Sequence, residues 1–512
     1  MLLHQSLDAS VSQKPQHTAL VVDKRSYTYA ELGAMVAVLA AELQARGVER
    51  GDRVALFLDN SVELVVGVLA ALAAGAVFMP VNPLTKADKL AYMLNDSRAT
   101  ALITQATLQP AYTEALKQNK SLRACLVAGN NEAGADADPR VVACPDLSVA
   151  GTATLRDPGL IDQDLASIIY TSGSTGDPKG VMLTHLNMVS AARSVSTYLG
   201  MRTDDVVMCV LPLAFDYGLY QLLMSVRLGA TLVLERSFTF PIKVLERMAE
   251  HHVTVFPGVP TVFSMLMNLG KSLGQHDLSA LRMITNTAVA LSEVHIRELR
   301  SLFPQAQLFS MYGLTECKRV TYLPPDQLDI RPTSVGRGMP NEEVWLVDDA
   351  GARLPNGSTG ELVIRGSNVM RGYWEKPEET AKRLKPGPIP GEMILHSGDV
   401  FRTDDEGYLY FVARKDDIIK SRGEKVSPRE VENALYALDG VYEAAVIGVP
   451  DDLLGQAVKA FVTLKPGYQF SEREVIKHCL GRLENFMAPK YVEFVDALPK
   501  TDTGKIKKTG LA

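Results

Sequence analysis

Apolar and polar positions along this chain follow a strand rhythm and a helix rhythm in turn. Short β-branched runs such as RVALFL at 53–58 alternate with longer helical patterns up to about residue 125. The alternation resumes at 165 and continues to about 413, with an apolar segment at 230–235 and a polar-faced helix at 241–252. Strands that alternate with helices are typical of βαβ units and a parallel sheet. We therefore predict an α/β architecture for this part of the chain.

The pattern changes after Arg414, where shorter segments indicate a compact α+β domain. Its expected helices and strands lie at 428–438, 443–449, 459–464 and 472–485. The junction ARKDD at 413–417 is charged, as an exposed hinge between domains should be. We predict a large N-terminal domain at 1–414 and a small C-terminal domain at 415–512. A stretch rich in Gly, Asn and Asp at 128–140 predicts a surface loop.

One uncharged stretch, from Leu64 to Val81, just reaches the length of a membrane span, about 18 residues. Gly75 and Pro80 interrupt it, and its first half is rich in alanine. We interpret it as an interior helix followed by a buried strand, and we expect no membrane partner. The first residues, MLLHQSLDASVSQ, have neither the basic start nor the long apolar run of a signal peptide.

Composition narrows the class of protein further. With 46% hydrophobic and 22% charged residues, the chain has the composition of a typical globular protein. Its 512 residues are too many for one compact core, so we expect more than one domain. A net charge of −6 argues against a large cationic surface for nucleic acid. The five cysteines are scattered without metal-ligand spacing, which indicates neither a disulfide framework nor a zinc site. We expect a reducing, cytoplasmic compartment.

The segment TSGSTGDPKG, which starts at Thr171, carries the clearest chemical signal. It follows the apolar strand LASIIY and precedes VMLTH. Small hydroxyl and glycine residues leave backbone N–H groups free to surround phosphate oxygens, and Lys179 adds a positive charge. Neither Gly173 nor Gly176 is followed at the required distance by Gly-Lys, so this is not a Walker loop. The segment therefore predicts a phosphate-binding turn of another class.

With this turn the chain resembles the adenylate-forming superfamily of acyl- and aryl-CoA synthetases, luciferases and peptide-synthetase adenylation domains. Its other motifs occur in the family's order, namely YTYAEL at 27–32, LAAGAVFMPVNP at 72–83, MYGLTE at 311–316, GELVIRGSNVMRGYW at 360–374, HSGD at 396–399, ARKDDIIKSRGEKVSP at 413–428 and PKTDTGKIKK at 499–508. The resemblance implies a large N-terminal domain of βα subdomains with a small mobile α+β C-terminal domain. It also implies that a carboxylate attacks the α-phosphorus of ATP, and that the acyl group of the acyl-AMP then passes to a thiol.

By this resemblance, ATP would bind to the N-terminal domain, and Lys505 of the C-terminal domain would reach it. The residues expected to bind it are Thr171, Ser172, Gly173, Ser174, Thr175, Gly176, Lys179, Thr287, Ala288, Tyr312, Asp399 and Arg414. Lys505 would reach the reacting carboxylate and the α-phosphate. Glu316 would hold Mg²⁺, with the Thr315 hydroxyl toward the α-phosphate. Asp416 would be the hinge about which the C-terminal domain reorients.

Two departures from the family pattern bear on the substrate. Residues 287–291 read TAVAL where relatives have a glycine pair, and the added side chains remove volume, which predicts a small acid. Phe215 and Asp216 match peptide-synthetase domains, in which the aspartate binds a substrate amino group. Burying this carboxylate unpaired would be costly, and a substrate ammonium would satisfy it, although an Asp that begins a helix is the alternative. We expect Tyr217 and Gly313 to line the same site.

We therefore predict an AMP-forming ligase for a small acid, an amino acid such as proline. The acyl group would pass to the phosphopantetheine thiol of a carrier protein supplied in trans, since Lys505 stands close to the last residue. The segment TECKRVTYLPP at 315–325 is similar to stand-alone enzymes of that type. The alternative is a small acyl- or aryl-CoA synthetase that uses free CoA. A degenerate member that only binds partners is a third hypothesis, and the presence of Lys505, Glu316 and Asp399 argues against it.

Overall fold

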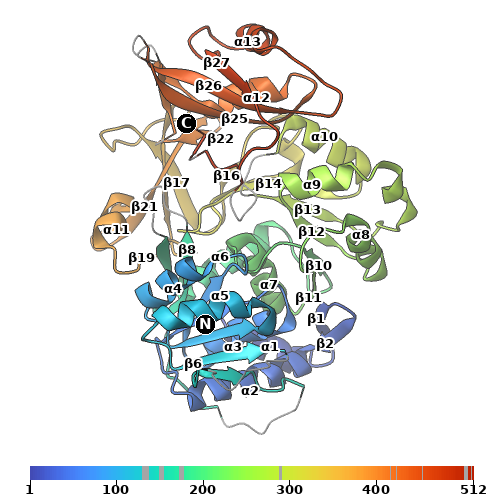
Figure 1. Ribbon diagram of the computed structural model, residues 1–512, viewed down its shortest axis with the longest axis vertical. Helices are drawn as coiled ribbons and strands as arrows, with labels where there is room; N and C mark the ends of the chain where they lie inside the picture. Colours follow the sequence, from blue (N-terminus) through green and yellow to red (C-terminus); the bar gives the residue numbers. More distant parts are fainter. Residues whose placement is uncertain are drawn as a thin grey trace. The chain divides into compact units, whose positions relative to one another are not determined.

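The computed structural model describes most of the chain (Figure 1). The described residues exclude 130–137, 149–154, 172–177, 288–290, 416, 422–423, 452–453, 501–505, 509 and 512, and the side chains of 271, 420, 425 and 455. They divide into two compact units. The first unit comprises Met1–Ile330, Gly338–Glu343 and Ile364–Leu395, and the second comprises Arg331–Arg337, Val344–Val363 and His396–Ala512. The boundary expected between 414 and 415 stays a prediction.

An eight-stranded sheet forms one half of the first unit, in the order β19-β9-β8-β4-β3-β5-β6-β7. Its strands are β3 (Arg53–Phe57), β4 (Val77–Val81), β5 (Ala101–Gln105), β6 (Ala124–Ala128), β7 (Val141–Ala143), β8 (Leu165–Thr171), β9 (Lys179–Thr184) and β19 (Gly372–Tyr373). The pairs from β4 to β7 are parallel, as the alternation of strands and helices predicted. The helices that follow these strands are α3 (Val62–Ala73), α4 (Ala87–Asp96), α5 (Gln109–Gln118) and α6 (His185–Tyr198).

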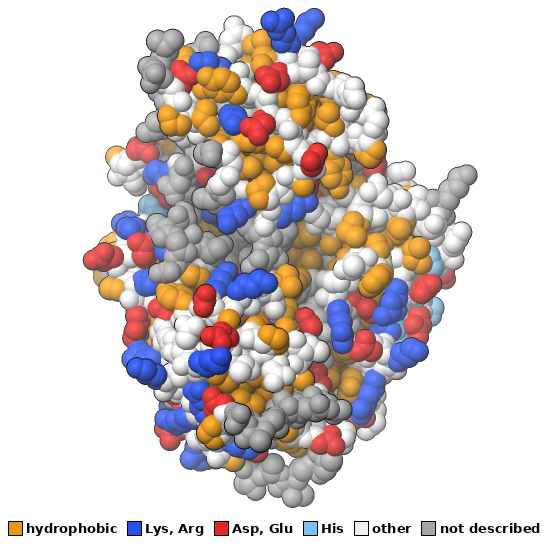
Figure 2. All heavy atoms as spheres, in the orientation of Figure 1, with side chains coloured by type: hydrophobic (Ala, Val, Ile, Leu, Met, Phe, Trp, Pro, Cys, Tyr) orange, Lys and Arg blue, Asp and Glu red, His pale blue; other side chains and the backbone are white. Residues whose placement is uncertain are grey.

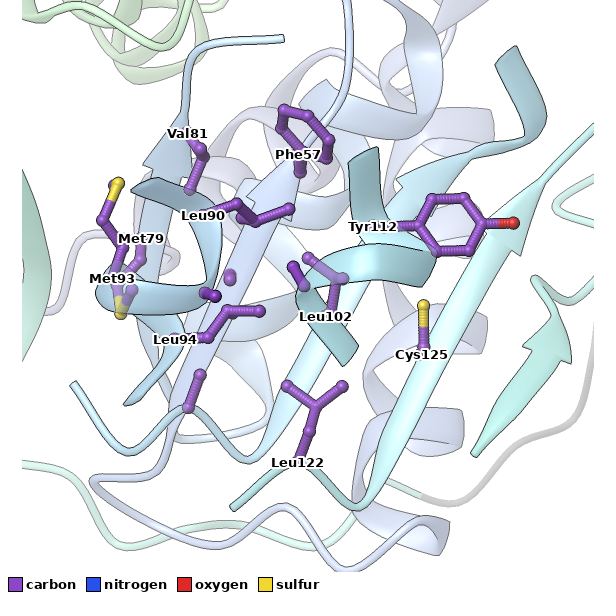
Figure 3. Close-up of a cluster of buried hydrophobic side chains, with 14 of the residues drawn as sticks. Phe57, Met79, Val81, Leu90, Met93, Leu94, Leu102, Tyr112, Leu122 and Cys125 are labelled. Atoms are coloured by element: carbon purple, nitrogen blue, oxygen red, sulfur yellow. The ribbon is translucent and has the colours of Figure 1, made fainter. Parts of the chain in front are cut away.

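One core cluster of this half lies between the sheet and helices α4 and α5 (Figure 3). Leu90, Met93 and Leu94 of α4 point toward strand residues such as Phe57 and Leu102, and all of them are buried. Burying such aliphatic and aromatic side chains stabilises the fold by about 1.5–3 kcal/mol for each side chain. The helix and the strand predicted between Leu64 and Val81 are confirmed as α3 and β4. Among the described residues, no helix has both the length and the apolarity to cross a membrane.

A nine-stranded sheet forms the other half of the first unit, in the order β16-β15-β14-β13-β12-β10-β11-β1-β2. Its strands are β1 (Thr18–Val22), β2 (Arg25–Thr28), β10 (Val206–Cys209), β11 (Thr231–Leu234), β12 (Val255–Gly258), β13 (Met283–Asn286), β14 (Gln307–Tyr312), β15 (Thr321–Leu323) and β16 (Arg337–Gly338). The pairs from β14 to β1 are parallel, so the carboxyl ends of these strands lie along one edge. The accompanying helices are α1 (Gln5–Gln13), α2 (Tyr29–Ala45), α7 (Asp216–Leu228), α8 (Pro241–Glu250), α9 (Pro260–Met267) and α10 (Glu293–Leu302).

A five-stranded sheet follows, in the order β17-β18-β21-β20 with β22 paired to β21. Its elements are β17 (Glu342–Val347), β18 (Thr359–Gly366), β20 (Leu384–Pro386), β21 (Met393–Thr403) and β22 (Leu409–Arg414), with helix α11 (Pro377–Arg383). The final sheet has the order β24-β23-β26-β25 with β27 on β26. Its elements are β23 (Ile419–Ser421), β24 (Glu424–Val426), β25 (Val441–Asp451), β26 (Gly455–Leu464), β27 (Tyr491–Phe494), α12 (Pro428–Tyr436) and α13 (Glu472–Leu480). Buried Val431, Leu435 and Val475 of the two helices pack on these strands, which confirms the predicted α+β pattern.

Charges of both signs are mixed on the face of the molecule that Figure 2 shows. Lys and Arg side chains are interspersed there with Asp and Glu side chains. This distribution agrees with the modest net charge of −6.

Candidate active site

The phosphate-loop segment joins two strands that pair with each other. Strands β8 and β9 are antiparallel, and their register places Thr171 opposite Lys179. Helix α6 begins only at His185, where the Thr184 hydroxyl and the Asn187 side chain form a capping box. The segment is therefore part of a hairpin, whereas a Walker loop leads from a strand into a helix. Ser172, Gly173, Ser174, Thr175 and Gly176 lie outside the described residues.

Lys179, expected to hold phosphates, forms an ion pair with Glu379 of α11. Lys382 pairs with the same carboxylate, and hydrogen bonds from the two ammonium groups lower the pKa of Glu379 to about 2. The Lys179 side chain is 15% exposed, and its Nζ lies 5.8 Å from the centroid of the Tyr373 ring. The positive charge of Lys179 is thus partly balanced within the chain, and a bound triphosphate would compete with Glu379 for it.

Strand β19 connects the phosphate hairpin to the YGLTE motif. Tyr373 pairs with Val181 of β9, and its hydroxyl donates a 2.7 Å hydrogen bond to Oε1 of Glu316. The other carboxylate oxygen of Glu316 has no hydrogen-bond donor among the described residues. A half-buried carboxylate oxygen of this kind is a ligand that Mg²⁺ prefers. The residues present therefore fit the metal that the motif implies at Glu316.

Three of the expected site segments lie at the carboxyl edge of the nine-stranded sheet. Thr287 follows β13, Gly313 follows β14, and the loop after β10 leads into α7 at Asp216. In open α/β sheets, ligands bind outside the carboxyl ends of the strands. The Thr287 hydroxyl is buried and has no hydrogen-bond partner among the described residues, as expected of a group that awaits a ligand. Ala288 lies outside the described residues.

The loop after β14 is closed tightly against its own backbone. The Val320 N–H donates a 2.9 Å hydrogen bond to the carbonyl of Tyr312, and Tyr312 pairs with Thr321 of β15. A Cβ on Gly313 would lie well inside van der Waals contact with the Lys318 carbonyl oxygen. Only glycine fits at position 313 without displacing this loop. Thr315 and Glu316 lie within the loop and are half-buried.

Asp216 is paired by a lysine from this loop. The Lys318 Nζ lies 2.5 Å from Asp216 Oδ1, and the Lys318 side chain is 0% exposed. Lys318 has a φ of 74°, an uncommon value for a residue other than glycine. Asp216 is the first residue of α7, after Phe215 at the N-cap, which agrees with the helix-start alternative. The chain itself thus supplies the positive charge that Asp216 was expected to take from a substrate ammonium.

Arg319 lies next to the predicted substrate residue Tyr217. Its guanidinium carbon is 4.7 Å from the centroid of the Tyr217 ring. The Tyr217 hydroxyl bonds to Thr285 of β13, 2.7 Å from the carbonyl oxygen and 2.6 Å from the side-chain oxygen. Tyr217 therefore fixes the start of α7 against the sheet, beside a buried cation.

Asp399 and Arg414, which are both expected to bind ATP, belong to the second unit. Asp399 of β21 pairs with Arg414 of β22, and 3.7 Å separate the Arg414 Nε from Asp399 Oδ1. Asp399 is buried, while the Arg414 side chain is 61% exposed. The structure thus brings these two residues together, and Glu316, Lys179 and the Asp216 region belong to the first unit. Lys505 and Asp416 lie outside the described residues.

Four residues without an expected role lie beside the predicted site residues, namely Lys318, Arg319, Tyr373 and Glu379. A signal was available for two of them. Lys318 and Arg319 are adjacent cations in a stretch that is otherwise small or apolar, and both are buried. Charged residues are almost never buried without a partner or a function. Two adjacent cations just after the YGLTE motif therefore indicate an ion pair or a binding role. Tyr373 lies within the motif at 360–374, whereas Glu379 carries no comparable local signal.

Comparisons with known proteins agree with the motifs and the fold. A family model for "AMP-binding enzyme" matches residues 7–374, and one for "AMP-binding enzyme C-terminal domain" matches residues 430–505. An octahydro-indenyl-propanoyl:CoA ligase of Rhodococcus jostii is 33% identical over 94% of this chain and 93% of its own length. A long-chain-fatty-acid–CoA ligase of Bacillus subtilis is 31% identical over 99% of this chain and 94% of its own length. Tyrocidine synthase 3 of Brevibacillus parabrevis is 30% identical over 99% of this chain, which corresponds to 8% of that protein.

Solved structures show the same architecture. ATP-bound MatB from Rhodopseudomonas palustris superposes with a TM-score of 0.88 at 29% identity, over 100% of this chain and 98% of that one. The anthranilate CoA ligase AuaEII in complex with anthranoyl-AMP gives a TM-score of 0.89 at 28% identity, over 99% of this chain and 95% of that one. The predicted α/β fold with a large N-terminal and a small C-terminal domain is confirmed. The chain belongs to the family of AMP-binding enzymes and is an adenylate-forming, AMP-producing acid–thiol ligase.

Proposed function

We propose that this enzyme activates a small carboxylic acid with ATP and transfers the acyl group to coenzyme A. The observation that carries this choice of substrate is the ion pair between Asp216 and Lys318. A carboxylate that already has a buried ammonium partner has little need of an amino group on the substrate. The relatives named as CoA ligases span nearly the whole chain, which supports CoA as the thiol. This proposal replaces the carrier-protein reading as the leading hypothesis.

The chemistry consists of two substitutions. In the first, a carboxylate oxygen bonds to the α-phosphorus of ATP, and the bond from that phosphorus to pyrophosphate breaks. In the second, the thiol sulfur of CoA bonds to the acyl carbon, its proton leaves, and AMP departs. Negative charge spreads over the phosphate oxygens in the first step, so positioned cations and donors should dominate the rate.

The chain's own groups would serve this first step as follows. Lys179 would exchange its contact with Glu379 for the leaving phosphates. Lys505 would neutralise charge between the carboxylate and the α-phosphate, and the Thr315 hydroxyl would donate to that phosphate. Glu316 would hold Mg²⁺, which supplies Lewis-acid neutralisation of the phosphate oxygens when bound. Tyr373 would keep the Glu316 carboxylate oriented through its 2.7 Å hydrogen bond.

Pyrophosphate exchange tests the proposed function directly. Purified enzyme receives labelled pyrophosphate, ATP and Mg²⁺ with short aliphatic acids, aryl acids or the amino acids, each in turn. We expect exchange with at least one small acid that lacks an amino group, and AMP release that rises on addition of CoA. Exchange restricted to an amino acid, with no stimulation by CoA, would contradict this proposal.

The runner-up is the amino-acid ligase that serves a carrier protein. The Phe215-Asp216 pair and the match to tyrocidine synthase 3 favour it. The same exchange panel separates the two functions, because proline and other amino acids would then support exchange while acids without an amino group would not. Acyl transfer to a phosphopantetheinylated carrier protein, with free CoA inactive, would complete that alternative.

A further inference from the structure

Arg319 is a buried cation whose charge no described carboxylate balances. The residue is 5% exposed. Its Nη1 donates a long bond of 3.3 Å to the Lys318 carbonyl, and its Nε has no acceptor among the described residues. Unlike a lysine, an arginine cannot escape the cost of burial by releasing its proton. An uncompensated buried charge is strongly unfavourable, so this one calls for a partner that binds there.

Neither neighbouring acid forms an ion pair with Arg319 in the described part of the chain. Asp216 pairs with Lys318, so this carboxylate and this ammonium balance each other. Glu342 accepts a 2.6 Å hydrogen bond from the Asn368 amide, and burial raises the pKa of the Glu342 carboxyl well above its usual range. Arg319 therefore has no ion-pair partner among the described carboxylates.

The position of Arg319 places this charge at the expected acyl site. Its guanidinium lies 4.7 Å from the ring centroid of Tyr217. The same loop carries Thr315 and Glu316, the residues expected beside the reacting phosphate and the metal. Arg319 is therefore near the bound acid and a few residues away from the groups that act on its reactive end.

We propose that Arg319 binds a second acidic group on the substrate, so that the enzyme's acid is a short dicarboxylic acid. This inference rests on the proposed function and specifies its substrate class. Two N–H groups of the guanidinium would hold both oxygens of the remote carboxylate, a geometry that a lysine cannot reproduce. The reactive carboxylate becomes the mixed anhydride with AMP and then the thioester, and the remote carboxylate is unchanged throughout. The product is the mono-CoA thioester of a diacid.

Matched substrates test the inference on the wild-type enzyme. Succinate, glutarate and adipate are compared with their monomethyl esters and with butyrate, pentanoate and hexanoate in the exchange assay. We expect one diacid to exceed its monomethyl ester and its monoacid in kcat/KM by about 10²-fold, the scale of a desolvated charged pair. A monoacid preference, with the diacids inactive, would overturn the inference and leave the proposed function standing. No exchange with any acid would instead contradict the proposed function.

Variants then separate binding from folding. Arg319→Gln should raise KM for the diacid by about 10²-fold while kcat/KM for the matched monoacid changes by less than about threefold. Arg319→Lys retains the charge without the two-pronged geometry and should have an intermediate KM. Arg297→Gln, which removes an arginine whose side chain is 71% exposed, is the control and should behave as wild type. Equal losses of kcat/KM for the diacid and the monoacid in both Arg319 variants would overturn the inference. If Arg319→Gln does not fold, Arg319→Lys and the wild-type substrate panel decide the question.

Discussion

The Lys318 Nζ lies 2.5 Å from Asp216 Oδ1, although 102 positions separate the two residues in the sequence. The ammonium comes from the loop after β14, and the carboxylate comes from the first turn of α7. Burial lowers the pKa of Lys318, and Asp216 opposes this shift. The pair therefore joins the two segments that are expected to line the acyl site.

Breaking this pair should cost more stability than losing a surface ion pair. We expect Asp216→Asn to lower the free energy of unfolding by about 3–5 kcal/mol, because it leaves a buried ammonium unpaired. Adding Lys318→Met should restore most of that loss, and urea titration of Asp216→Asn, Lys318→Met and the double variant against wild type gives the coupling energy. Glu114→Gln, which removes the exposed partner of Lys117, is the control and should cost less than about 1 kcal/mol. A stable Asp216→Asn protein that has lost only amino-acid exchange would favour the carrier-protein alternative.

Gly313 should tolerate no side chain. Gly313→Ala places a methyl group against the backbone carbonyl of Lys318, which lies in a closed loop and has no free side chain to move aside. We expect a loss of several kcal/mol in stability, or a displaced loop and activity reduced by about 10²-fold. Gly274→Ala is the control, because nothing lies within 4 Å of the added carbon. Thermal unfolding and pyrophosphate exchange are measured for both variants. Equal unfolding temperatures and equal exchange rates would contradict the described geometry of the loop.

Lys179 should matter through its charge toward the phosphates. Lys179→Met should lower exchange by about 10²–10³-fold, the scale for losing one charge-stabilising donor. Lys382→Met is the control, because Lys382 is the other partner of Glu379 and its side chain is 68% exposed. This variant should leave the rate of pyrophosphate exchange nearly unchanged. Glu379→Gln should lower KM for ATP, because it removes a competitor for Lys179. An unchanged KM in that variant would indicate that the ion pair does not oppose nucleotide binding.

The C-terminal lysine is expected to act in adenylation. Lys505→Ala should reduce exchange by about 10²–10³-fold. Lys508→Ala provides a matched control three positions away, since the Lys508 Nζ is 2.6 Å from Glu432 and serves the C-terminal unit. The control should retain exchange within a few-fold of wild type. Wild-type exchange in Lys505→Ala would show that the assignment of this lysine is misplaced.

Acid should weaken the fold through His185. Burial lowers the pKa of this imidazole from 6.5 to about 4, and its Nδ1 accepts a 3.0 Å hydrogen bond from the Leu3 N–H. Because the folded form resists protonation, the stability contributed by His185 is complete above pH 6.5 and is lost as pH falls toward 4. The loss is on the order of 3 kcal/mol over this window. In His185→Phe this part of the pH dependence should disappear, and an unchanged slope of stability against pH would contradict it.

Much of the fold was predictable from local patterns. The apolar continuity of Leu64 to Val81 predicted α3 and β4, and Gly75 marks the turn between them with a φ of 92°. The apolar run that starts at Val206 continues to Leu213, but β10 ends at Cys209. Pro212 offers no N–H to a neighbouring strand, and the Leu211 carbonyl bonds instead to the Asn60 side chain at 2.9 Å. A tertiary contact of this kind leaves no signal in the local sequence.

The site was predictable where motifs carry it and less so elsewhere. The hydroxyl and glycine pattern at 171–180 and the YGLTE motif predict the nucleotide-binding segments, and this assignment stays a prediction. Nothing local shows that Lys318 adopts a left-handed backbone and turns its ammonium to Asp216, because the partner is remote and the conformation is rare for lysine. The burial of Arg319 likewise depends on how the loop closes against α7.

Because β8 and β9 are paired, the spacing between Thr171 and Lys179 also sets which way Lys179 faces. Successive residues of a strand point to opposite sides, so one inserted or deleted residue would either bulge the hairpin or turn Lys179 away from Glu379. Over evolutionary descent, this enzyme should therefore keep the number of residues between Thr171 and Lys179 fixed.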